Sequence, residues 1–219
     1  MTDLKALLHH HEAVIFDMDG TIVNTEPLHA KAAVIVLKSR GYDIDLEACL
    51  DQFYGMTDTA VLKMTCPELS DAEVETAIAE KNQHLLQLFQ ALPSHEKNQY
   101  ITPGLFDFLT YLKKQGKSIA VVSASEDIVV EKTLECFSIT SFVDLQMGRG
   151  QTVLTKPHPE PYIEGMKRLK SPPEKTLIFE DSPTGLKSAL ASGANVIRIT
   201  GFAHSDEVLH SHEIKNFLF

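Results

Sequence analysis

The sequence contains few cysteines and no apolar run of membrane-spanning length. Its three cysteines, Cys49, Cys66 and Cys136, are odd in number and widely spaced, and no CxxC pair occurs. This usage fits a reducing compartment better than a disulfide framework. A membrane-spanning helix needs about 20 apolar residues in a row, and the N-terminus also lacks the apolar stretch of a signal peptide. We therefore expect a soluble, cytoplasmic protein.

Basic residues are also scarce. The chain has 20 Lys and Arg residues against 30 Asp and Glu residues, which gives a net charge of −10 at pH 7. This balance argues against a nucleic-acid partner, because a phosphate backbone is bound by clustered positive charge. With 219 residues, 43% of them hydrophobic, the chain can bury a globular core and can accommodate an inserted domain.

Several common catalytic motifs are missing. No GxSxG occurs, and the His-Glu pairs at 11–12, 95–96 and 212–213 lack the second histidine of an HExxH motif. The run His9–His11 could bind a stray metal ion, but a solvated tail is the favoured interpretation.

The most informative stretch is Asp17-Met18-Asp19-Gly20-Thr21, which follows the apolar run at residues 13–16. A short apolar run bounded by glycine predicts a buried strand. Two carboxylates would then leave its carboxyl end, where open α/β sheets bind their ligands. Two buried like charges are unfavourable unless a cation or a proton compensates them. Taken alone, the motif could also be an acidic turn.

Two further apolar runs are followed by polar side chains suited to phosphate chemistry. Residues 118–122 end before Ser123, and residues 176–179 end before Glu180-Asp181. Lys156 stands in a proline-rich loop that leads into a predicted helix. Taken alone, Ser123 would more often be a helix N-cap and Lys156 a solvated surface lysine. Only their shared context favours a functional role.

In this order, the motifs resemble those of the haloacid dehalogenase-like hydrolase superfamily. The resemblance is closest to the branch that holds β-phosphoglucomutase and the small sugar-phosphate phosphatases. It extends from Val14 to about Thr200. Each motif alone is a weak or moderate indication, whereas the ordered set is a strong one.

The predicted elements indicate an α/β fold. Strands are expected at 13–17, 118–122, about 142–147, 176–180 and 195–199, and they alternate with helical stretches, which is typical of a doubly wound parallel sheet. In the core, helices are expected at 104–115, capped by Thr102, and from Ser182 to Gly193.

About a hundred residues separate the first two strands, which is too many for one crossover helix. Helices are expected there at 28–39, about 58–65 and 71–90, and Ser70 to Glu73 has the spacing of a capping box. This interval resembles the α-helical cap of the family branch. We place an inserted cap domain at 26–97 and the Rossmann-like α/β core at 1–25 and 98–219.

The resemblance implies a role for each motif residue. Asp17 would be the nucleophile that forms an aspartyl-phosphate, and Asp19 would be the general acid and base. The implied Mg²⁺ ligands are Asp17, the backbone carbonyl of Asp19, and Asp181, with Glu180 close by. Mg²⁺ suits such a site because it is a hard cation that binds carboxylate, phosphate and water oxygens.

Phosphate and substrate contacts are implied from both domains. They are Ser123, the Ala124 N–H, Lys156, Thr25, His29 and Gly55. For His29, a histidine on the surface of a helix is an equally weighted alternative. Lys81 could add positive charge to the cap, but a solvated lysine is the favoured interpretation.

Three departures from the family pattern stand out. Asn24 occupies a position that is commonly aspartate in relatives, and Arg149-Gly150 lies six residues before Lys156, so the loop is longer. Asp58 occupies the position of an arginine that, in β-phosphoglucomutase, grips the non-transferring phosphate. An acidic side chain there would repel that phosphate, which argues against mutase chemistry.

The favoured function is a Mg²⁺-dependent phosphatase that acts on a small phosphorylated metabolite, with a sugar phosphate as the expected substrate. A phosphosugar mutase is the alternative. A phospho-acceptor switch and a catalytically silent sensor of phosphorylated metabolites are remote alternatives. Asp19 argues against dehalogenases and phosphonate hydrolases, which do not keep an aspartate at this position. We expect a monomer without nucleic-acid or membrane partners.

Overall fold

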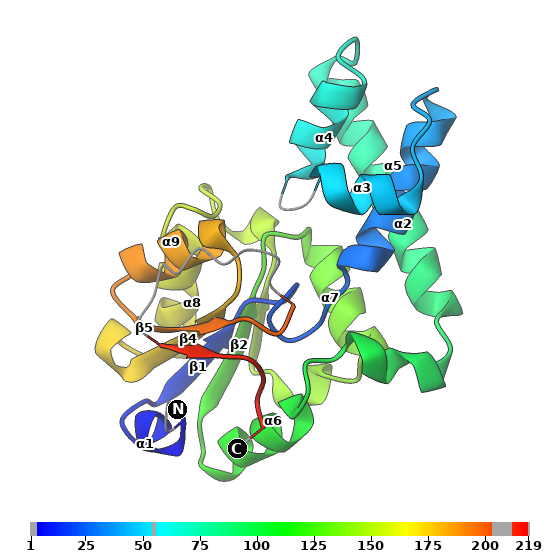
Figure 1. Cartoon of the computed structure of the whole chain (residues 1–219). Coiled ribbons are helices and arrows are strands. Elements are labelled where there is room, and N and C mark those ends of the chain that lie inside the picture. Colours follow the sequence, from blue (N-terminus) through cyan, green and yellow to red (C-terminus); the bar gives the residue numbers. More distant parts are fainter. Residues whose placement is uncertain (1–3, 54–55, 203–211, 219) are drawn as a thin grey trace. The chain divides into compact units, whose positions relative to one another are not determined.

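The structure is a computed structural model that describes residues 4–53, 56–202 and 212–218 (Figure 1). Its contacts divide the chain into two compact units, Met1–Asn24 with His95–Phe219, and Thr25–Ser94. We call the first the core unit and the second the helical unit. The domain limits expected from the sequence were 26 and 97. That the helical unit serves as a cap stays a prediction.

Among the described residues, the core unit contains a six-stranded parallel sheet in the order β3-β2-β1-β4-β5-β6. The strands are β1 (Ala13–Phe16), β2 (Ser118–Val122), β3 (Leu145–Met147), β4 (Thr176–Glu180), β5 (Asn195–Ile199) and β6 (Glu213–Ile214). The first five lie where the apolar runs predicted them, and the parallel, doubly wound sheet is confirmed. The edge strand β6 has only two residues, too few to produce a periodic signal.

The strands are continuous apolar runs because helices cover both faces of the sheet. Ile15 and Ile178 face α8 (Glu160–Leu169) and α9 (Pro183–Ala191), which lie on one side of the sheet (Figure 1). The next residues, Phe16 and Phe179, face the opposite side and stack with ring centroids 5.2 Å apart. Phe108 of α6 (Leu105–Lys114) packs edge-on against both rings.

The start of α6 differs from the prediction. Thr102 does not cap this helix, because its hydroxyl donates instead to the carbonyl oxygen of Thr21, 2.6 Å away. Gly104 occupies the N-cap with φ +83°, and a Cβ there would collide with the backbone of Phe217. Both the backbone angle and the close approach therefore require glycine. At α9 the prediction is confirmed, since Ser182 Oγ accepts the Gly185 N–H at 3.0 Å.

The helical unit contains α2 (Glu26–Ser39), α3 (Leu46–Phe53), α4 (Asp58–Thr65) and α5 (Asp71–Ala91). Apolar side chains from all four helices form one buried cluster. The capping box of α5 is confirmed, because Ser70 and Glu73 exchange side-chain to backbone hydrogen bonds. Of these four helices, α3 alone was not predicted from the sequence. The remaining described helices are α1 (Leu4–His9), α7 (Asp127–Cys136) and the 3₁₀ segments Ser94–Tyr100, Thr140–Phe142, Arg149–Gln151 and Pro173–Lys175.

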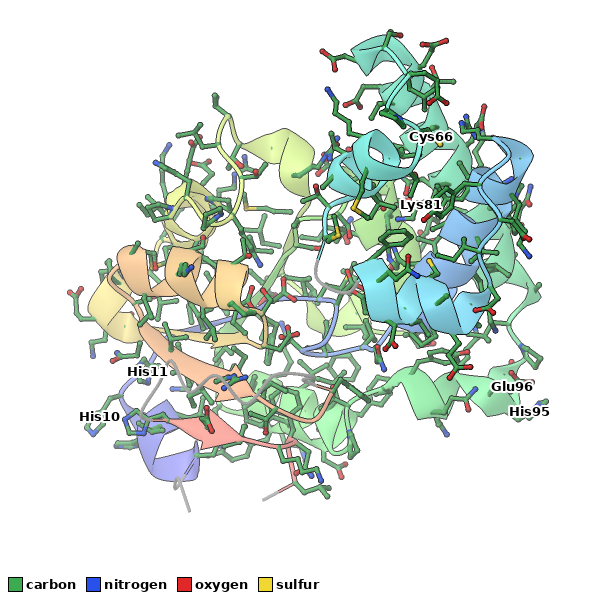
Figure 2. All side chains as sticks on the ribbon, turned by 45° about the horizontal axis from the view of Figure 1, so that its top comes forward. His10, His11, Cys66, Lys81, His95 and Glu96 are labelled. Atoms are coloured by element: carbon green, nitrogen blue, oxygen red, sulfur yellow. The ribbon has the colours of Figure 1, made fainter. Side chains whose placement is uncertain are left out.

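The histidine run is not a uniformly solvated tail. His9 and His10 are exposed at the end of α1, but His11 is buried, with 5% of its surface exposed (Figure 2). His11 Nδ1 lies 2.7 Å from the carbonyl oxygen of Leu7, and its Nε2 lies 2.9 Å from the side-chain amide of Asn195. The solvated-tail interpretation is therefore wrong for His11. Within the described part of the chain, no helix combines the length and the apolar character needed to cross a membrane.

Candidate active site

The carboxylates predicted from the sequence meet at the carboxyl ends of two neighbouring strands. Phe16 of β1 pairs with Phe179 of β4, so Asp17 follows β1 at the level where β4 ends in Glu180. The Asp17 N–H donates to the Phe179 carbonyl at 2.9 Å and extends the ladder. Because β2 lies on one side of β1 and β4 on the other, the strand order reverses here, and open α/β sheets bind ligands at such a point.

Asp17, Glu180 and Asp181 form a buried acidic cluster. Each offers a carboxylate oxygen, and these oxygens lie within 4.8 Å of one another. Burial raises the pKa of Asp17 to about 8, with Lys156 acting against the rise and Glu180 adding to it. Burial, followed by the charges of Glu180 and Asp17, raises the pKa of Asp181 well above its ordinary value. The cluster therefore favours a bound cation or a proton.

Lys156 is at the centre of this cluster and not in solvent. Its Nζ lies 2.6 Å from Asp17 Oδ1, 2.8 Å from Glu180 Oε1 and 3.0 Å from the carbonyl oxygen of Val122. Only 4% of the side chain is exposed. Burial acts to lower the pKa of Lys156, but the two carboxylates outweigh it and raise the pKa. The longer loop after Gly150 therefore still delivers this lysine to Asp17.

Glu180 is held by hydrogen bonds on both of its oxygens. Oε1 accepts from Lys156 and from the hydroxyl of Tyr162 at 3.0 Å. Oε2 accepts from the backbone N–H and the hydroxyl of Ser182, at 2.9 and 3.1 Å. A Cβ at Gly185 would collide with this carboxylate, so glycine is required there. These contacts show that Glu180 holds Lys156 in place.

Sequence reasoning missed Tyr162. It lies on α8, its hydroxyl and ring are fully buried, and the Lys156 ammonium sits 4.7 Å from the ring centroid. Burial, and then the charge of Glu180, raises its pKa well above the ordinary value, so the hydroxyl remains a hydrogen-bond donor. The available signal was a tyrosine on the buried face of the helix that follows the Lys156 loop.

The Gly-Thr pair of the first motif supports Asp181. Thr21 Oγ1 donates to Asp181 Oδ1 at 2.9 Å. Gly20 has φ +86°, and a Cβ at this position would collide with the Asp181 carboxylate. The turn after β1 therefore packs closely against the carboxylate of Asp181, which directly follows β4, and glycine is required at position 20.

Asp19 and Ser123 belong to a second, hydroxyl-rich part of the site. Asp19 Oδ2 accepts a hydrogen bond from Ser125 Oγ at 3.3 Å, and the Ser125 N–H donates to Ser123 Oγ at 3.1 Å. Ser123 is buried, and it is not the N-cap of α7, which is Glu126. Ala124 is exposed between the two serines. Ser125 was missed, although the Ser-Ala-Ser sequence offers a second hydroxyl.

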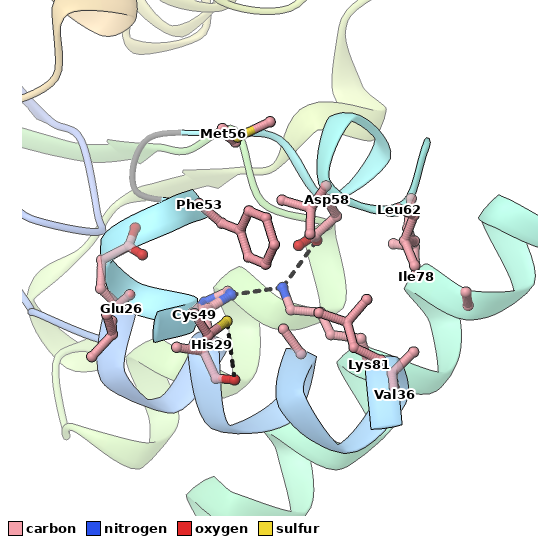
Figure 3. A pocket seen from close by; sticks show the side chains of 16 residues that line it. Glu26, His29, Val36, Cys49, Phe53, Met56, Asp58, Leu62, Ile78 and Lys81 are labelled. Carbon is pink, nitrogen blue, oxygen red and sulfur yellow. Dashed lines mark hydrogen bonds and ion pairs between the residues drawn. The ribbon is translucent and has the colours of Figure 1, made fainter. Parts of the chain in front are cut away.

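The remaining predicted site residues belong to the helical unit. Thr25 is buried at the N-cap of α2. His29 contacts Lys81, with 2.8 Å between His29 Nδ1 and Lys81 Nζ (Figure 3). Lys81 is buried, so the interpretation as a solvated lysine is wrong. Gly55 lies outside the described residues.

The acidic cluster has the chemistry of a Mg²⁺ site. Three carboxylates and one ammonium leave a formal charge of −2, and carboxylate oxygens are ligands that Mg²⁺ prefers. Asp17 and Asp181 each accept a side-chain hydrogen bond on Oδ1, from Lys156 and Thr21. Glu180 accepts four hydrogen bonds. Asp17 and Asp181 are therefore better suited than Glu180 to bind the ion directly.

The chain is similar in sequence and in fold to known proteins. The family profile described as haloacid dehalogenase-like hydrolase matches residues 14–199. The phosphorylated carbohydrates phosphatase of Thermotoga maritima is 29% identical over 89% of this chain and 86% of its own length. Hexitol phosphatase B of Escherichia coli K12 is 27% identical over 82% of this chain and 79% of its own. The crystal structure of β-phosphoglucomutase from Clostridium difficile superposes with a TM-score of 0.78 at 23% identity, over 94% of this chain and 92% of its own, which shows a shared fold.

Proposed function

The chain belongs to the haloacid dehalogenase-like hydrolase family, and we propose that it works as a Mg²⁺-dependent phosphatase of small phosphomonoesters, through an aspartyl-phosphate on Asp17. The enzyme class expected from the sequence, a phosphatase of this family, is confirmed. The observation that carries the proposed mechanism is the buried group of Asp17, Asp181 and Lys156 at the carboxyl ends of β1 and β4. This group combines a nucleophile with the charges that a phosphoryl group needs.

In the first step, a carboxylate oxygen of Asp17 attacks phosphorus, and the bond from phosphorus to the substrate's ester oxygen breaks. Asp19 donates a proton to the departing oxygen, so that the leaving group is an alcohol. In the second step, Asp19 takes a proton from water, and this water attacks the phosphorus of the aspartyl-phosphate. Inorganic phosphate leaves, and Asp17 and Asp19 return to their starting states.

The other residues position the two catalytic aspartates and stabilise the phosphoryl group. Lys156 holds Asp17 at 2.6 Å and offsets negative charge as the phosphoryl group approaches. Ser123 and the Ala124 N–H would donate to phosphoryl oxygens, and Ser125 orients Asp19 through its 3.3 Å hydrogen bond. Mg²⁺, held by Asp17, Asp181 and the carbonyl oxygen of Asp19, would supply further positive charge next to the phosphoryl oxygens.

A sugar phosphate is the substrate class that we propose. Relatives named for phosphorylated carbohydrates and hexitol align over most of this chain, which supports the choice. The direct test is a phosphate-release screen of the purified protein over sugar phosphates, nucleotides and small phosphoacids, with Mg²⁺ and with a chelator. We expect release from at least one sugar phosphate, and only with Mg²⁺. Equal rates in excess chelator, or release from none of the compounds, would contradict the proposal.

A second assay separates hydrolysis from phosphoryl transfer between two positions of a sugar. β-Glucose 1-phosphate is incubated with enzyme, Mg²⁺ and a trace of glucose 1,6-bisphosphate, and the products are followed by phosphorus NMR. A phosphatase uses water as the acceptor, so free phosphate accumulates without a need for the bisphosphate. If glucose 6-phosphate accumulated faster than free phosphate, the enzyme would be a mutase.

A further inference from the structure

Lys156 reaches Asp17 from a segment with little regular structure. Residues 148–159 join β3 to α8, and their backbone forms neither a strand nor an α-helix. Nζ of Lys156 nevertheless lies at a defined point, 2.6 Å from Asp17 Oδ1. Lysine is among the side chains with the most rotamer freedom. Its backbone must therefore be held firmly if Nζ is to stay at this point, and the contacts that hold it must come from side chains.

Glu160, the first residue of α8, binds the backbone of this segment. Its Oε1 accepts the Val153 N–H at 3.0 Å, and its Oε2 accepts the Leu154 N–H at 3.1 Å. Both N–H groups come from residues that shortly precede Lys156. Hydrogen bonds to an ionised carboxylate are roughly twice as strong as those between neutral groups. Residues 153–160 thus form a loop that carries Lys156 and is closed by these two hydrogen bonds.

Apolar packing does not explain how this turn of the chain is held. Val153 is 90% exposed and Leu154 is 46% exposed. The hydrophobic effect stabilises a side chain in proportion to the apolar surface that is removed from water, so Val153 gains little from its position. The N–H groups of both residues, by contrast, are bound by Glu160. The carboxylate is therefore the contact that orients this turn.

Two other side chains hold the segment on either side of this turn. At its start, Oδ1 of Asp127 on α7 accepts the Gly148 N–H at 3.0 Å. Near its end, the hydroxyl of the buried Ser188 on α9 donates to the carbonyl oxygen of His158 at 2.6 Å. The middle of the segment, directly before Lys156, is the part that Glu160 binds.

We propose that Glu160 is a positioning residue, which holds this loop so that the Lys156 ammonium stays against Asp17. The inference rests on the proposed function, in which the ammonium holds the nucleophile and offsets the charge of the phosphoryl group. Glu160 acts through the backbone of Val153 and Leu154. The alternative is that Glu160 serves α8 alone, because the helix dipole favours a carboxylate in the first turn of a helix. In that case, loss of the carboxylate would leave Lys156 where it is.

Reductive methylation of Lys156 distinguishes these two roles without turnover. The full chain is treated with formaldehyde and a borane, and the methylation of each lysine is followed by mass spectrometry of its peptides. Wild-type Lys156 should react slowly, since its side chain is only 4% exposed. Glu160→Gln keeps the size of the side chain but replaces one acceptor oxygen by a donor, and Glu160→Ala removes both oxygens. Opening of the loop should raise the methylation rate at Lys156 at least about fivefold in the first variant and about tenfold in the second.

A matched control and an internal reference accompany this measurement. Glu47→Gln removes a first-turn carboxylate from α3 and should leave the rate at Lys156 unchanged. Lys117 precedes β2, and its Nζ donates to the carbonyl oxygen of His11, so its rate reports on the core unit as a whole. An unchanged rate at Lys156 in both Glu160 variants would overturn the proposal. Equal acceleration at Lys156 and Lys117 would also overturn it, because the core unit would then have loosened in general.

The consequence for catalysis is measured on the same variants. In Glu160→Ala, turnover at saturating substrate should fall at least about tenfold, because a small displacement of a catalytic group can lower the rate by about a hundredfold. Glu47→Gln should match the wild type. Wild-type turnover in a variant whose Lys156 is readily methylated would refute the positioning role. If the wild type hydrolyses no phosphomonoester, the proposed function fails, whereas the methylation rates still decide whether Glu160 holds Lys156.

Discussion

Nζ of Lys156 lies 2.6 Å from Oδ1 of Asp17, and both side chains are buried. Lys156 also pairs with Glu180. It therefore stabilises the folded chain as well as the proposed nucleophile. In Lys156→Met two buried carboxylates lose their cation. We expect a loss of about 3–5 kcal/mol in unfolding free energy by urea titration and at least about a hundredfold lower turnover. Lys132→Met removes an exposed ion-paired lysine and should change neither. If the two variants had the same unfolding free energy and the same turnover, Lys156 would have no role in the site.

Asp17→Asn removes the proposed nucleophile and keeps its shape. Without the covalent intermediate, turnover should fall by at least about a thousandfold, because residues that act as a unit fail together. Asp107→Asn, on the exposed face of α6, is the matched control and should retain activity. Acid-quenched wild-type enzyme should yield a phosphorylated peptide that contains Asp17. Phosphate on another peptide would disprove this assignment.

The metal prediction separates Asp181 from Glu180. Chelation should abolish activity and Mg²⁺ should restore it, while Ca²⁺ should inhibit, because its larger and more variable shell misplaces the phosphate. By calorimetric titration, Asp181→Ala should weaken Mg²⁺ binding more than Glu180→Gln does, since Glu180 is engaged with Lys156, Tyr162 and Ser182. The reverse order would mean that Glu180 is the direct ligand.

Tyr162→Phe tests the anchor of Glu180. This change removes one hydrogen bond to a buried carboxylate, 3.0 Å long, and leaves the ring in place. We expect a loss of about 1.5–3 kcal/mol in unfolding free energy, typical of a hydrogen bond to a charged group. The rate should fall less than in Lys156→Met, because Lys156 keeps Asp17. Tyr42→Phe, in the helical unit, is the matched control. Unchanged stability of Tyr162→Phe would show that Ser182 and Lys156 hold Glu180 without it.

The parts of the fold that the sequence predicted are those with strong local signals. The apolar runs that form β1, β2, β4 and β5 are long enough to be recognised in the sequence. The capping box at Ser70 is recognised by its residue spacing. Thr102 was misassigned because a threonine before a proline satisfies the local rule for an N-cap. Its hydroxyl bonds Thr21, 81 residues away in the chain.

The same distinction holds within the site. Asp17, Glu180 and Asp181 were recognisable because each lies at or directly after the carboxyl end of a buried strand, in a motif of fixed spacing. The roles of Tyr162 and Lys81 were not recognisable. From its position on a helix alone, a tyrosine is expected to pack in the core and a lysine to lie in solvent. Their partners, Glu180 and Asp58, come from other elements. Burial of a polar side chain is decided by tertiary packing, and periodicity does not report it.

His11 gives a prediction about stability and pH. Nδ1–H donates to Leu7 and Nε2 accepts from the Asn195 amide, so both ring nitrogens are satisfied in the neutral form. Burial, more than any other cause, lowers the pKa of His11, and the hydrogen bond to Leu7 acts in the opposite direction. In the unfolded chain the ring titrates near its ordinary value of about 6.5.

As the pH falls below about 6.5, the unfolded state therefore binds a proton that the folded state resists, and stability is lost. In His11→Gln this loss is absent, so the stability difference between wild type and variant should shrink between about pH 7.5 and 5.5. Urea titrations over that range measure it, and His10→Gln, at an exposed position, should run parallel to wild type. Other groups titrate in all three proteins and cancel in the differences. A constant gap between wild type and His11→Gln would show that His11 is not held in its neutral form.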